Sequence, residues 1–173
     1  MSASAFRVEA LGDTHERASF DCGDDVLDRY FRTQATEDIR RHIANCFVAV
    51  ESASGRVAAY YTLSAVSLPF NHLPPEETRR LPRYPTVPAV RIGRLAVDRR
   101  FQGRGLASTM LADACAKAVQ ADIAAFMLVV DAKNDRAVAF YRHHEFRLVA
   151  GAPRTLFLPL STARKVFLRE PAH

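Results

Sequence analysis

The sequence has no hydrophobic run long enough to cross a membrane. Its longest apolar stretches, such as residues 123–130, have the length of a β-strand, whereas a membrane-spanning helix needs about 20 apolar residues. The first residues, Met-Ser-Ala-Ser-Ala-Phe-Arg, also lack the apolar segment of a signal peptide. We therefore expect a cytoplasmic protein that makes no contact with a membrane.

Cysteine is scarce and follows no pattern that binds metal or forms disulfides. The chain has 3 cysteines, Cys22, Cys46 and Cys115, which lie far apart and form no CxxC pair. An odd number of scattered cysteines indicates free thiols that are buried or half-buried in the fold. We expect neither a metal site nor a catalytic cysteine.

Internal repeats and low-complexity segments are absent too, and the remaining composition is that of one globular domain. The chain has 173 residues, of which 49% are hydrophobic and 25% are charged. We therefore expect residues 1–173 to form a single domain that buries a full core. The formal charge of +5 favours anionic partners, which include coenzyme A and RNA.

Segments with the periodicity of strands and of helices alternate along the chain, which predicts an α+β (α/β layered) fold. The expected strands lie at residues 6–11, 47–51, 56–63, 90–97, 124–130, 146–149 and 155–160. Asp24 is placed to cap an amphipathic helix that continues to Arg41, with one break allowed before Cys46. Further helices are expected at residues 105–120 and 134–143 and as a short helix at the C-terminus.

Residues 69–88 differ from the rest of the chain because they contain six prolines. A proline-rich segment between two strands is expected to be an ordered excursion that borders a functional site. A helical turn is expected within it at residues 76–80.

The most informative segment is the turn at residues 100–105, which joins a strand to a helix. Gly103 and Gly105 lack side chains, so a ligand can approach the backbone closely. The amides of residues 103–107 lie at a helix N-terminus, where unpaired N–H groups and the helix dipole attract an anion. The turn therefore predicts a pyrophosphate site, although two glycines before a helix can also form an ordinary tight turn.

The residues around this turn exclude two common kinds of phosphate-binding site. Arg99, Arg100 and Arg104 add positive charge. The segment has neither the Lys-Ser/Thr pair of a P-loop nor the third spaced glycine of a dinucleotide-binding fingerprint. The site is therefore of another kind.

The motif Arg100-Phe-Gln-Gly103-Arg-Gly105 resembles the acetyl-CoA motif Arg/Gln-x-x-Gly-x-Gly/Ala of the GNAT superfamily of acetyltransferases. The preceding strand at residues 93–97 and the later Asn134-x-x-Ala137-x-x-Phe140-Tyr141-x-x-x-x-Phe146 are similar to further signatures of that superfamily. The resemblance covers roughly residues 5–165. It implies the GNAT fold, with a mixed central sheet of six to seven strands flanked by about four helices, and acetyl-CoA as the cosubstrate.

Five shorter segments resemble one branch of this superfamily, the toxins of type II toxin–antitoxin systems. They are residues 20–23, 27–30, 60–63, 81–85 and 93–98. That branch acetylates the α-amino group of an aminoacyl-tRNA and so blocks translation. The resemblance implies an aminoacyl-tRNA substrate, a ribbon-helix-helix antitoxin as partner and a homodimer.

The resemblance also assigns roles to residues. Tyr141 is the expected catalytic residue, because a phenol with a pKa of about 10 can hydrogen-bond or protonate the departing CoA thiolate; the alternative is packing as a helix aromatic. Asn134 either caps its helix or hydrogen-bonds to the pantetheine arm. The residues expected to bind acetyl-CoA are Leu95, Ala96, Val97, Arg99, Arg100, Gln102, Gly103, Arg104, Gly105, Leu106, Ala107, Ser108, Asn134 and Phe140. At residues 95–97 the main chain is expected to do so, while the side chains join the core.

The sequence marks fewer residues for the amine that accepts the acetyl group than for acetyl-CoA. No residue is marked as a general base, including His143 and His144. A free α-amine has a pKa of roughly 8, and the neighbouring ester lowers it, so positioning could supply most of the acceleration. The arginines around the proline-rich segment are expected either to bind tRNA phosphates or to be solvated surface charges; they are Arg79, Arg80, Arg83, Arg91 and Arg94.

One position departs from the family pattern. A glycine usually precedes the final phenylalanine of the second signature, and here Glu145 precedes Phe146. Glycine at that place commonly permits a left-handed turn after the helix. We therefore expect Glu145 to strain or reshape the turn near Tyr141.

Two other functions stay open at this point. One is a GNAT N-acetyltransferase that acts on a small amine or a protein N-terminus. The other is a CoA-binding module without catalytic activity.

Overall fold

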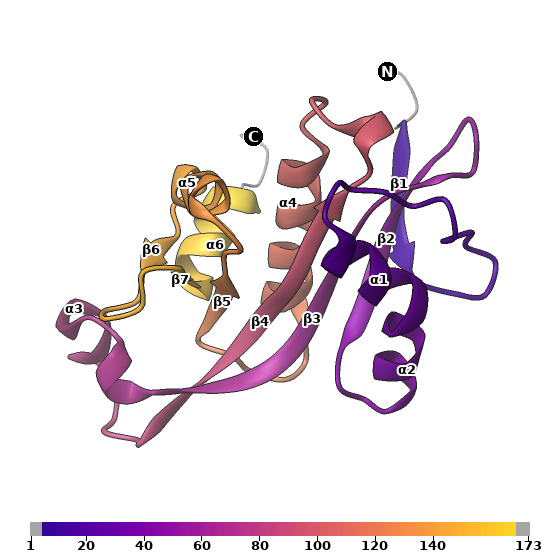
Figure 1. The fold of residues 1–173 in the computed structure, drawn as a ribbon. Helices are drawn as coiled ribbons and strands as arrows, with labels where there is room; N and C mark the ends of the chain where they lie inside the picture. The colour runs from indigo at the N-terminus through magenta and orange to yellow at the C-terminus, as the bar shows by residue number, and fades with distance from the viewer. Residues whose placement is uncertain (1–4, 169–173) are drawn as a thin grey trace, which may run out of the picture. The chain divides into compact units, whose positions relative to one another are not determined.

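The computed structural model describes residues 5–168 and confirms an α+β fold with a mixed sheet (Figure 1). Seven strands are hydrogen-bonded in the order β1-β2-β3-β4-β5-β7-β6. The pair β4–β5 is parallel, and the pairs β1–β2, β2–β3, β5–β7 and β6–β7 are antiparallel. The strands are β1 (Phe6–Ala10), β2 (Asn45–Glu51), β3 (Val57–Pro69), β4 (Thr86–Val97), β5 (Met127–Asp131), β6 (Arg147–Leu148) and β7 (Thr155–Pro159).

Six α-helices and two short 3-10 helices lie within the described residues. They are α1 (Asp25–Thr33), α2 (Ala35–Arg40), α3 (Pro75–Thr78), α4 (Leu106–Gln120), α5 (Asp135–His143), α6 (Leu160–Phe167), η1 (Phe70–His72) and η2 (Arg99–Phe101). The sequence predicted about four helices. The difference arises because α3 is a separate single turn and because the first predicted helix is divided at Gln34.

The break at Gln34 has a local cause. The Thr33 hydroxyl donates to the carbonyl of Arg29 at 2.7 Å, which competes with regular helical bonding. Gln34 follows with φ −116° and ψ −28°, which is still in the right-handed region although its φ departs from the helical value of about −63°. The Asp24 side chain caps α1 as expected, since it accepts hydrogen bonds from the N–H groups of Val26 and Leu27.

The two central strands are longer than their periodicity indicated. β3 continues to Pro69 and β4 begins at Thr86. The segment between them therefore shrinks to residues 70–85, which we call the proline-rich segment. It contains η1 and α3, so the expected ordered excursion with a helical turn is confirmed.

The chain divides into two compact units, each with a core of its own. The first unit comprises the chain up to Ser64 together with Gly93–Ala114. The second comprises Ala65–Ile92 together with the chain from Cys115 onward.

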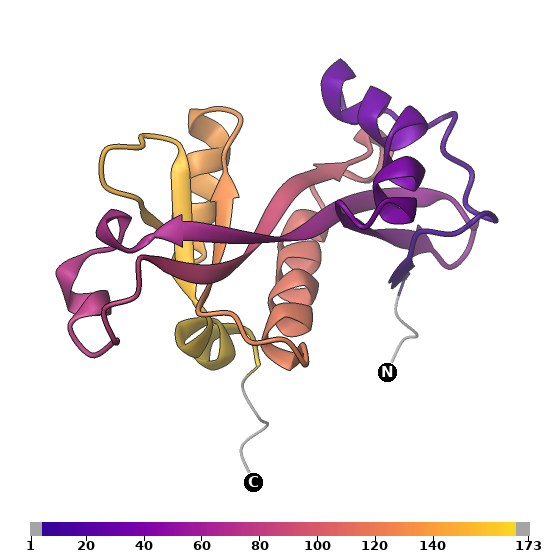
Figure 2. The ribbon, with the colours of Figure 1, turned by 90° about the horizontal axis from the view of Figure 1, so that it is seen from below.

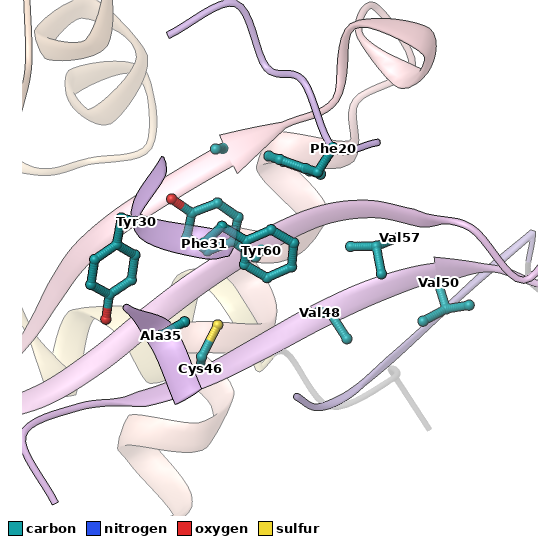
Figure 3. Close-up of a cluster of buried hydrophobic side chains, with 10 residues drawn as sticks. Phe20, Tyr30, Phe31, Ala35, Cys46, Val48, Val50, Val57 and Tyr60 are labelled. Atoms are coloured by element: carbon teal, nitrogen blue, oxygen red, sulfur yellow. The ribbon is translucent and has the colours of Figure 1, made fainter. Parts of the chain in front are cut away.

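Aromatic side chains form the core of the first unit (Figure 3). The rings of Phe31 and Tyr60 stack with centroids 4.4 Å apart, and Phe20 meets both rings edge-on. The Tyr60 hydroxyl donates to the Leu27 carbonyl at 2.7 Å, so its buried oxygen is satisfied. Tyr61, the next residue, points to the opposite face and donates to Asp113 of α4. Within this unit, α1 and α2 thus cover one face of the sheet and α4 begins on the other (Figure 2).

The core of the second unit lies on β4, β5 and β7. Its buried members are Leu73, Val87, Ala89, Met127, Val129, Val149 and Phe157. α6 packs on β5 and β7. Leu73 reaches this core from the proline-rich segment and is only 6% exposed, which anchors that segment to the sheet.

Candidate functional site

The turn that follows β4, which we call the cofactor turn, comprises residues 98–105 of the first unit. Gly103 has φ +79° and Gly105 has φ +75°, in the left-handed region that favours glycine. A Cβ added at either glycine would meet no atom within 4 Å. The turn therefore needs both glycines for its backbone and leaves open space beside it for a ligand.

The cofactor turn leads directly into the start of α4. The first N–H groups of a helix have no acceptor within the helix, and the dipole makes this end positive. Leu106 is 4% exposed and fixes the helix start in the core, while Ala107 and Ser108 are half-buried beside it. A pyrophosphate fits this end of the helix.

Arg99 and Arg104 are exposed and only loosely paired. Arg99 Nε lies 3.4 Å from an Asp21 carboxylate oxygen, and Arg104 Nη1 lies 3.9 Å from one of Glu51. Surface pairs of this kind contribute about 0–1 kcal/mol. Both guanidinium groups can therefore turn toward an anionic ligand.

A buried carboxylate holds the cofactor turn together. Asp98 is 1% exposed and accepts hydrogen bonds from the N–H groups of Asp21 (3.0 Å) and Arg100 (2.9 Å). It also accepts from Nε (3.0 Å) and Nη2 (3.1 Å) of the Arg100 guanidinium. Burial by itself raises the pKa of Asp98, but the hydrogen bonds from Arg100 and Asp21 outweigh it, and the net pKa is lowered.

Arg100 therefore differs from its two basic neighbours. Its guanidinium is engaged by Asp98, and this contact raises the pKa of Arg100. Its visible role is to shape the turn. The sequence analysis assigned no role to Asp98. Its position between the end of a strand and two arginines could have indicated that it pairs with one of them.

Residues 20–23 lie against the cofactor turn. The N–H of Arg99 donates to the Asp21 carbonyl at 2.8 Å. The Gln102 side chain donates to the carbonyls of Cys22 (3.2 Å) and Val97 (2.9 Å). This segment, whose sequence resembles the toxin branch, thus supports the turn that the sequence assigns to the cofactor.

The strand that enters the turn continues beyond its pairing with β5, and the Val97 carbonyl there accepts a hydrogen bond from Gln102. The parallel register of β4 with β5 ends at Ile92 and Val130, so residues 93–97 extend beyond it. The Ala96 side chain is buried in the aromatic core, and Leu95 and Val97 are half-buried. Only Ala96 joins the core as expected, whereas Leu95 and Val97 stay half-buried. The backbone of this stretch could pair with the amides of an extended ligand.

In the second unit, α5 carries the expected catalytic residue. The Asn134 side chain accepts a hydrogen bond from the N–H of Ala137 at 2.9 Å, so it caps α5. Tyr141 is 5% exposed, and its ring lies 5.1 Å from Phe140 and 5.4 Å from Phe146 between centroids. Within the described part of the chain, the Tyr141 hydroxyl makes no hydrogen bond. Burial, with a smaller contribution from Cys115, raises the pKa of Tyr141 above its usual value, so the phenol stays protonated at neutral pH.

At the end of α5, Glu145 stands where the family usually has a glycine. Its φ is +73°, which is strained for any residue with a Cβ. The N–H of Phe146 donates to the Tyr141 carbonyl and that of Glu145 to the Arg142 carbonyl, each at 3.1 Å. These two bonds form a Schellman motif, so the usual glycine turn is kept and strain is accepted at Glu145.

The histidines beside Tyr141 have the environment of packing residues. The ring of His144 lies 5.0 Å from that of Phe140 and 6.0 Å from that of Phe167. Burial and the neighbouring His143 lower the pKa of His144. Neither geometry nor sequence marks a general base among the described residues.

The five arginines expected at the RNA are divided between the units. In the first unit, the Arg94 guanidinium lies 3.5 Å from the centre of the Tyr30 ring. In the second, Nε of Arg91 is buried without a hydrogen bond, 3.8 Å from a carboxylate oxygen of Asp131. The others are exposed in the proline-rich segment and, among residues 5–168, form no ion pair; they are Arg79, Arg80 and Arg83.

The cysteines are free thiols, as expected. Burial raises the pKa of Cys46 and of Cys115 to about 12, so neither is a nucleophile at neutral pH. Between residues 5 and 168, no group of His, Cys, Asp and Glu side chains could hold a metal ion. In the same range, no helix combines the length and the apolar character that a membrane span requires.

Comparison with known proteins gives consistent results. The model of the acetyltransferase (GNAT) family matches residues 9–146. A protein of Mycobacterium tuberculosis named tRNA-acetylating toxin is 36% identical over 156 residues, which cover 89% of this chain and 92% of that protein. The structure of AtaT complexed with acetyl-methionyl-tRNAfMet has a TM-score of 0.86 and 29% identity, with 94% of this chain and 99% of that chain covered. A mutant AtaT toxin bound to the C-terminus of the antitoxin AtaR and acetyl-CoA has a TM-score of 0.79 and 26% identity, with 96% and 100% covered.

Proposed function

Because this chain belongs to the acetyltransferase (GNAT) family, we propose that it transfers acetyl from acetyl-CoA to the α-amino group of an aminoacyl-tRNA. The product can no longer enter translation normally, so the chain acts as the toxin of a toxin–antitoxin pair. The observation that carries the acetyl-CoA part of the proposal is the open cofactor turn, with two left-handed glycines before a helix start and two loosely paired arginines.

The donor is held by groups of the first unit. The amides at the start of α4 and the side chains of Arg99 and Arg104 bind the pyrophosphate, while Asp98 and Arg100 keep the turn in shape. The backbone of residues 95–97 pairs with the pantetheine arm. Acetyl-CoA supplies a thioester: the neutral α-amine attacks its carbonyl carbon, a C–N bond forms, the C–S bond breaks, and the proton of the amine passes to solvent.

Tyr141 assists the departure of the sulfur. A thiol has an ordinary pKa of about 8.5 and a phenol one of about 10, and burial raises the pKa of Tyr141 further. Complete proton transfer from Tyr141 to the thiolate is therefore uphill. The hydroxyl acts instead as a hydrogen-bond donor that stabilises the developing negative charge, a contribution of about 10²–10³ in kcat for a donor of this kind.

The acceptor assignment rests on charge and on the relatives. The exposed arginines of the proline-rich segment offer unpaired positive charge of the kind that binds phosphates. A relative with 36% identity is named for tRNA acetylation, and AtaT has been solved with an acetylated aminoacyl-tRNA. The proposal extends to an antitoxin of the ribbon-helix-helix class and to a homodimer, which light scattering would detect as twice the chain mass of 19.3 kDa.

The decisive experiment supplies labelled acetyl-CoA and a mixed pool of aminoacyl-tRNA to the purified chain. Nuclease digestion and mass spectrometry should find acetyl on the α-amino group of the aminoacyl-adenosine, and deacylated tRNA should stay unlabelled. Label on small amines or protein N-termini, with none on aminoacyl-tRNA, would refute the acceptor assignment.

The role of Tyr141 is tested in the same assay. Tyr141→Phe should lower kcat by about 10²–10³ and leave the Kd for acetyl-CoA unchanged. Tyr60→Phe is the matched control, because it also removes a buried phenol hydroxyl. It should cost about 1 kcal/mol of stability without lowering kcat. Full turnover in Tyr141→Phe would exclude the assigned role.

A further inference from the structure

The proline-rich segment presents an aromatic side chain to solvent. Tyr84 is 64% exposed and lies between Arg83 and Pro85. Across the described residues, its ring contacts no other ring or cation, and its hydroxyl makes no hydrogen bond. Tyr84 therefore contributes nothing visible to the folding of the second unit.

The backbone that carries Tyr84 is nonetheless held in place. The N–H of Phe70 donates to the Pro85 carbonyl at 3.1 Å and closes the base of the segment. The N–H of Tyr84 donates to the Pro82 carbonyl at 2.9 Å, and Leu73 anchors the segment in the core. A ring on such a support loses little conformational entropy when a ligand binds.

The proline-rich segment carries unpaired positive charge because its acidic residues are neutralised from elsewhere. Arg147 of β6 donates to Glu77 at 2.6 Å and lies 3.7 Å from Glu76. No such partner exists among the described residues for the segment's own arginines, which are Arg79, Arg80 and Arg83. The segment that carries this exposed ring thus also carries three exposed arginines without an ion-pair partner.

We propose that Tyr84 stacks on an unpaired base at the 3′ end of the tRNA, while Arg79, Arg80 and Arg83 bind the adjoining phosphates. The inference rests on the proposed function, which places the acceptor amine on that end of the tRNA. A ring flanked by guanidinium groups is the combination that binds single-stranded nucleic acid. A duplex offers this ring no base face, since its bases are stacked on one another.

An acidic protein segment is the competing ligand. It would satisfy the three arginines but would gain nothing specific from the exposed Tyr84 ring. A nucleotide uses both features, because its phosphate meets the guanidinium groups and its base covers the ring.

The test compares three variants for binding to aminoacyl-tRNA at fixed salt. Tyr84→Ala should weaken binding by about tenfold or more and raise KM for the tRNA with kcat unchanged. Tyr84→Phe keeps the ring and should bind within about twofold of the wild type. Ile123→Ala is the matched control, because it truncates another exposed apolar side chain, 85% exposed, and should bind as the wild type does.

A trimmed tRNA separates base stacking from general attraction. Removal of the unpaired 3′ nucleotides should weaken binding to the wild type, and Tyr84→Ala should cause no further loss on the trimmed RNA. The Kd for acetyl-CoA should be the same in all variants, which shows that they are folded.

Three results would overturn the inference. They are wild-type affinity in Tyr84→Ala, an equal loss on intact and trimmed tRNA, and an effect of Tyr84→Ala on a protein partner alone. Failure of the proposed function looks different: the wild type would then bind tRNA with the expected dependence on Tyr84 but transfer no acetyl to it.

Discussion

Replacing Asp98 by asparagine should loosen the cofactor turn without changing the volume of the side chain. Asp98 is 1% exposed and accepts four hydrogen bonds, two from main-chain N–H groups and two from the Arg100 guanidinium. In the variant, one carboxylate oxygen becomes an NH2 group. In either orientation that group faces the Arg100 guanidinium and one main-chain N–H, of Asp21 or of Arg100, so donor meets donor.

The loss of unfolding free energy depends on how deeply Asp98 and Arg100 are each buried. Breaking one partner of a buried charged pair costs about 3–5 kcal/mol. The Arg100 side chain is 38% exposed and can turn to water, so the lower end of that range applies. We expect Asp98→Asn to lose about 3 kcal/mol of unfolding free energy and to bind acetyl-CoA more weakly, since the turn that carries the amides is displaced.

Urea denaturation and titration with acetyl-CoA measure both effects. Because the pKa of Asp98 is lowered in the folded state, its contribution to stability is complete above its unfolded pKa of about 3.9. It is lost as the pH falls through the folded value. The acid side of the stability curve should therefore be flatter in Asp98→Asn than in the wild type.

Asp122→Asn is the control, because Asp122 is exposed and, in residues 5–168, forms no ion pair. It should shift the unfolding free energy by less than about 0.5 kcal/mol. If Asp98→Asn unfolded at the wild-type urea midpoint and kept the wild-type affinity for acetyl-CoA, the assigned role of Asp98 would be wrong.

Two further substitutions test backbone and packing. Glu145→Gly should stabilise the fold by about 0.5–1 kcal/mol. Relief of the left-handed conformation gains roughly 1–2 kcal/mol, and the extra entropy that glycine loses on folding takes back about 0.5–1 kcal/mol. Glu145→Ala keeps a Cβ and should give no gain in Tm; a gain there would contradict the strain argument. Gly93→Ala should destabilise by about 1–3 kcal/mol, because its Cβ would lie 2.9 Å from Oγ1 of Thr62. That hydroxyl is buried without a hydrogen-bond partner, so Thr62→Ala in the same chain should restore most of the loss, whereas additive effects in urea unfolding would show that the two residues are not in conflict.

The features that depend on short stretches of chain were predictable. Gly103 and Gly105 before a helix start indicated an open turn, and both are left-handed with open space beside them; anion binding there stays a prediction. A glutamate at the usual glycine position indicated strain, and Glu145 is left-handed. Most strands and helices followed from periodicity, because alternation and helical spacing are properties of consecutive residues.

Partners far apart in the chain were decided by tertiary structure alone. The hydrogen bond from the Asp21 N–H to the buried Asp98, the support of the cofactor turn by residues 20–23 and the neutralisation of Glu77 by Arg147 have no local signature. Each depends on which elements pack together, and a charged side chain looks the same in sequence whether its partner is a carboxylate or a ligand. The sequence by itself determined the left-handed glycine turn before α4, because glycine spacing is local. The tertiary structure decided which arginines of that turn are engaged by carboxylates and which remain available to bind a phosphate, because those partners depend on packing.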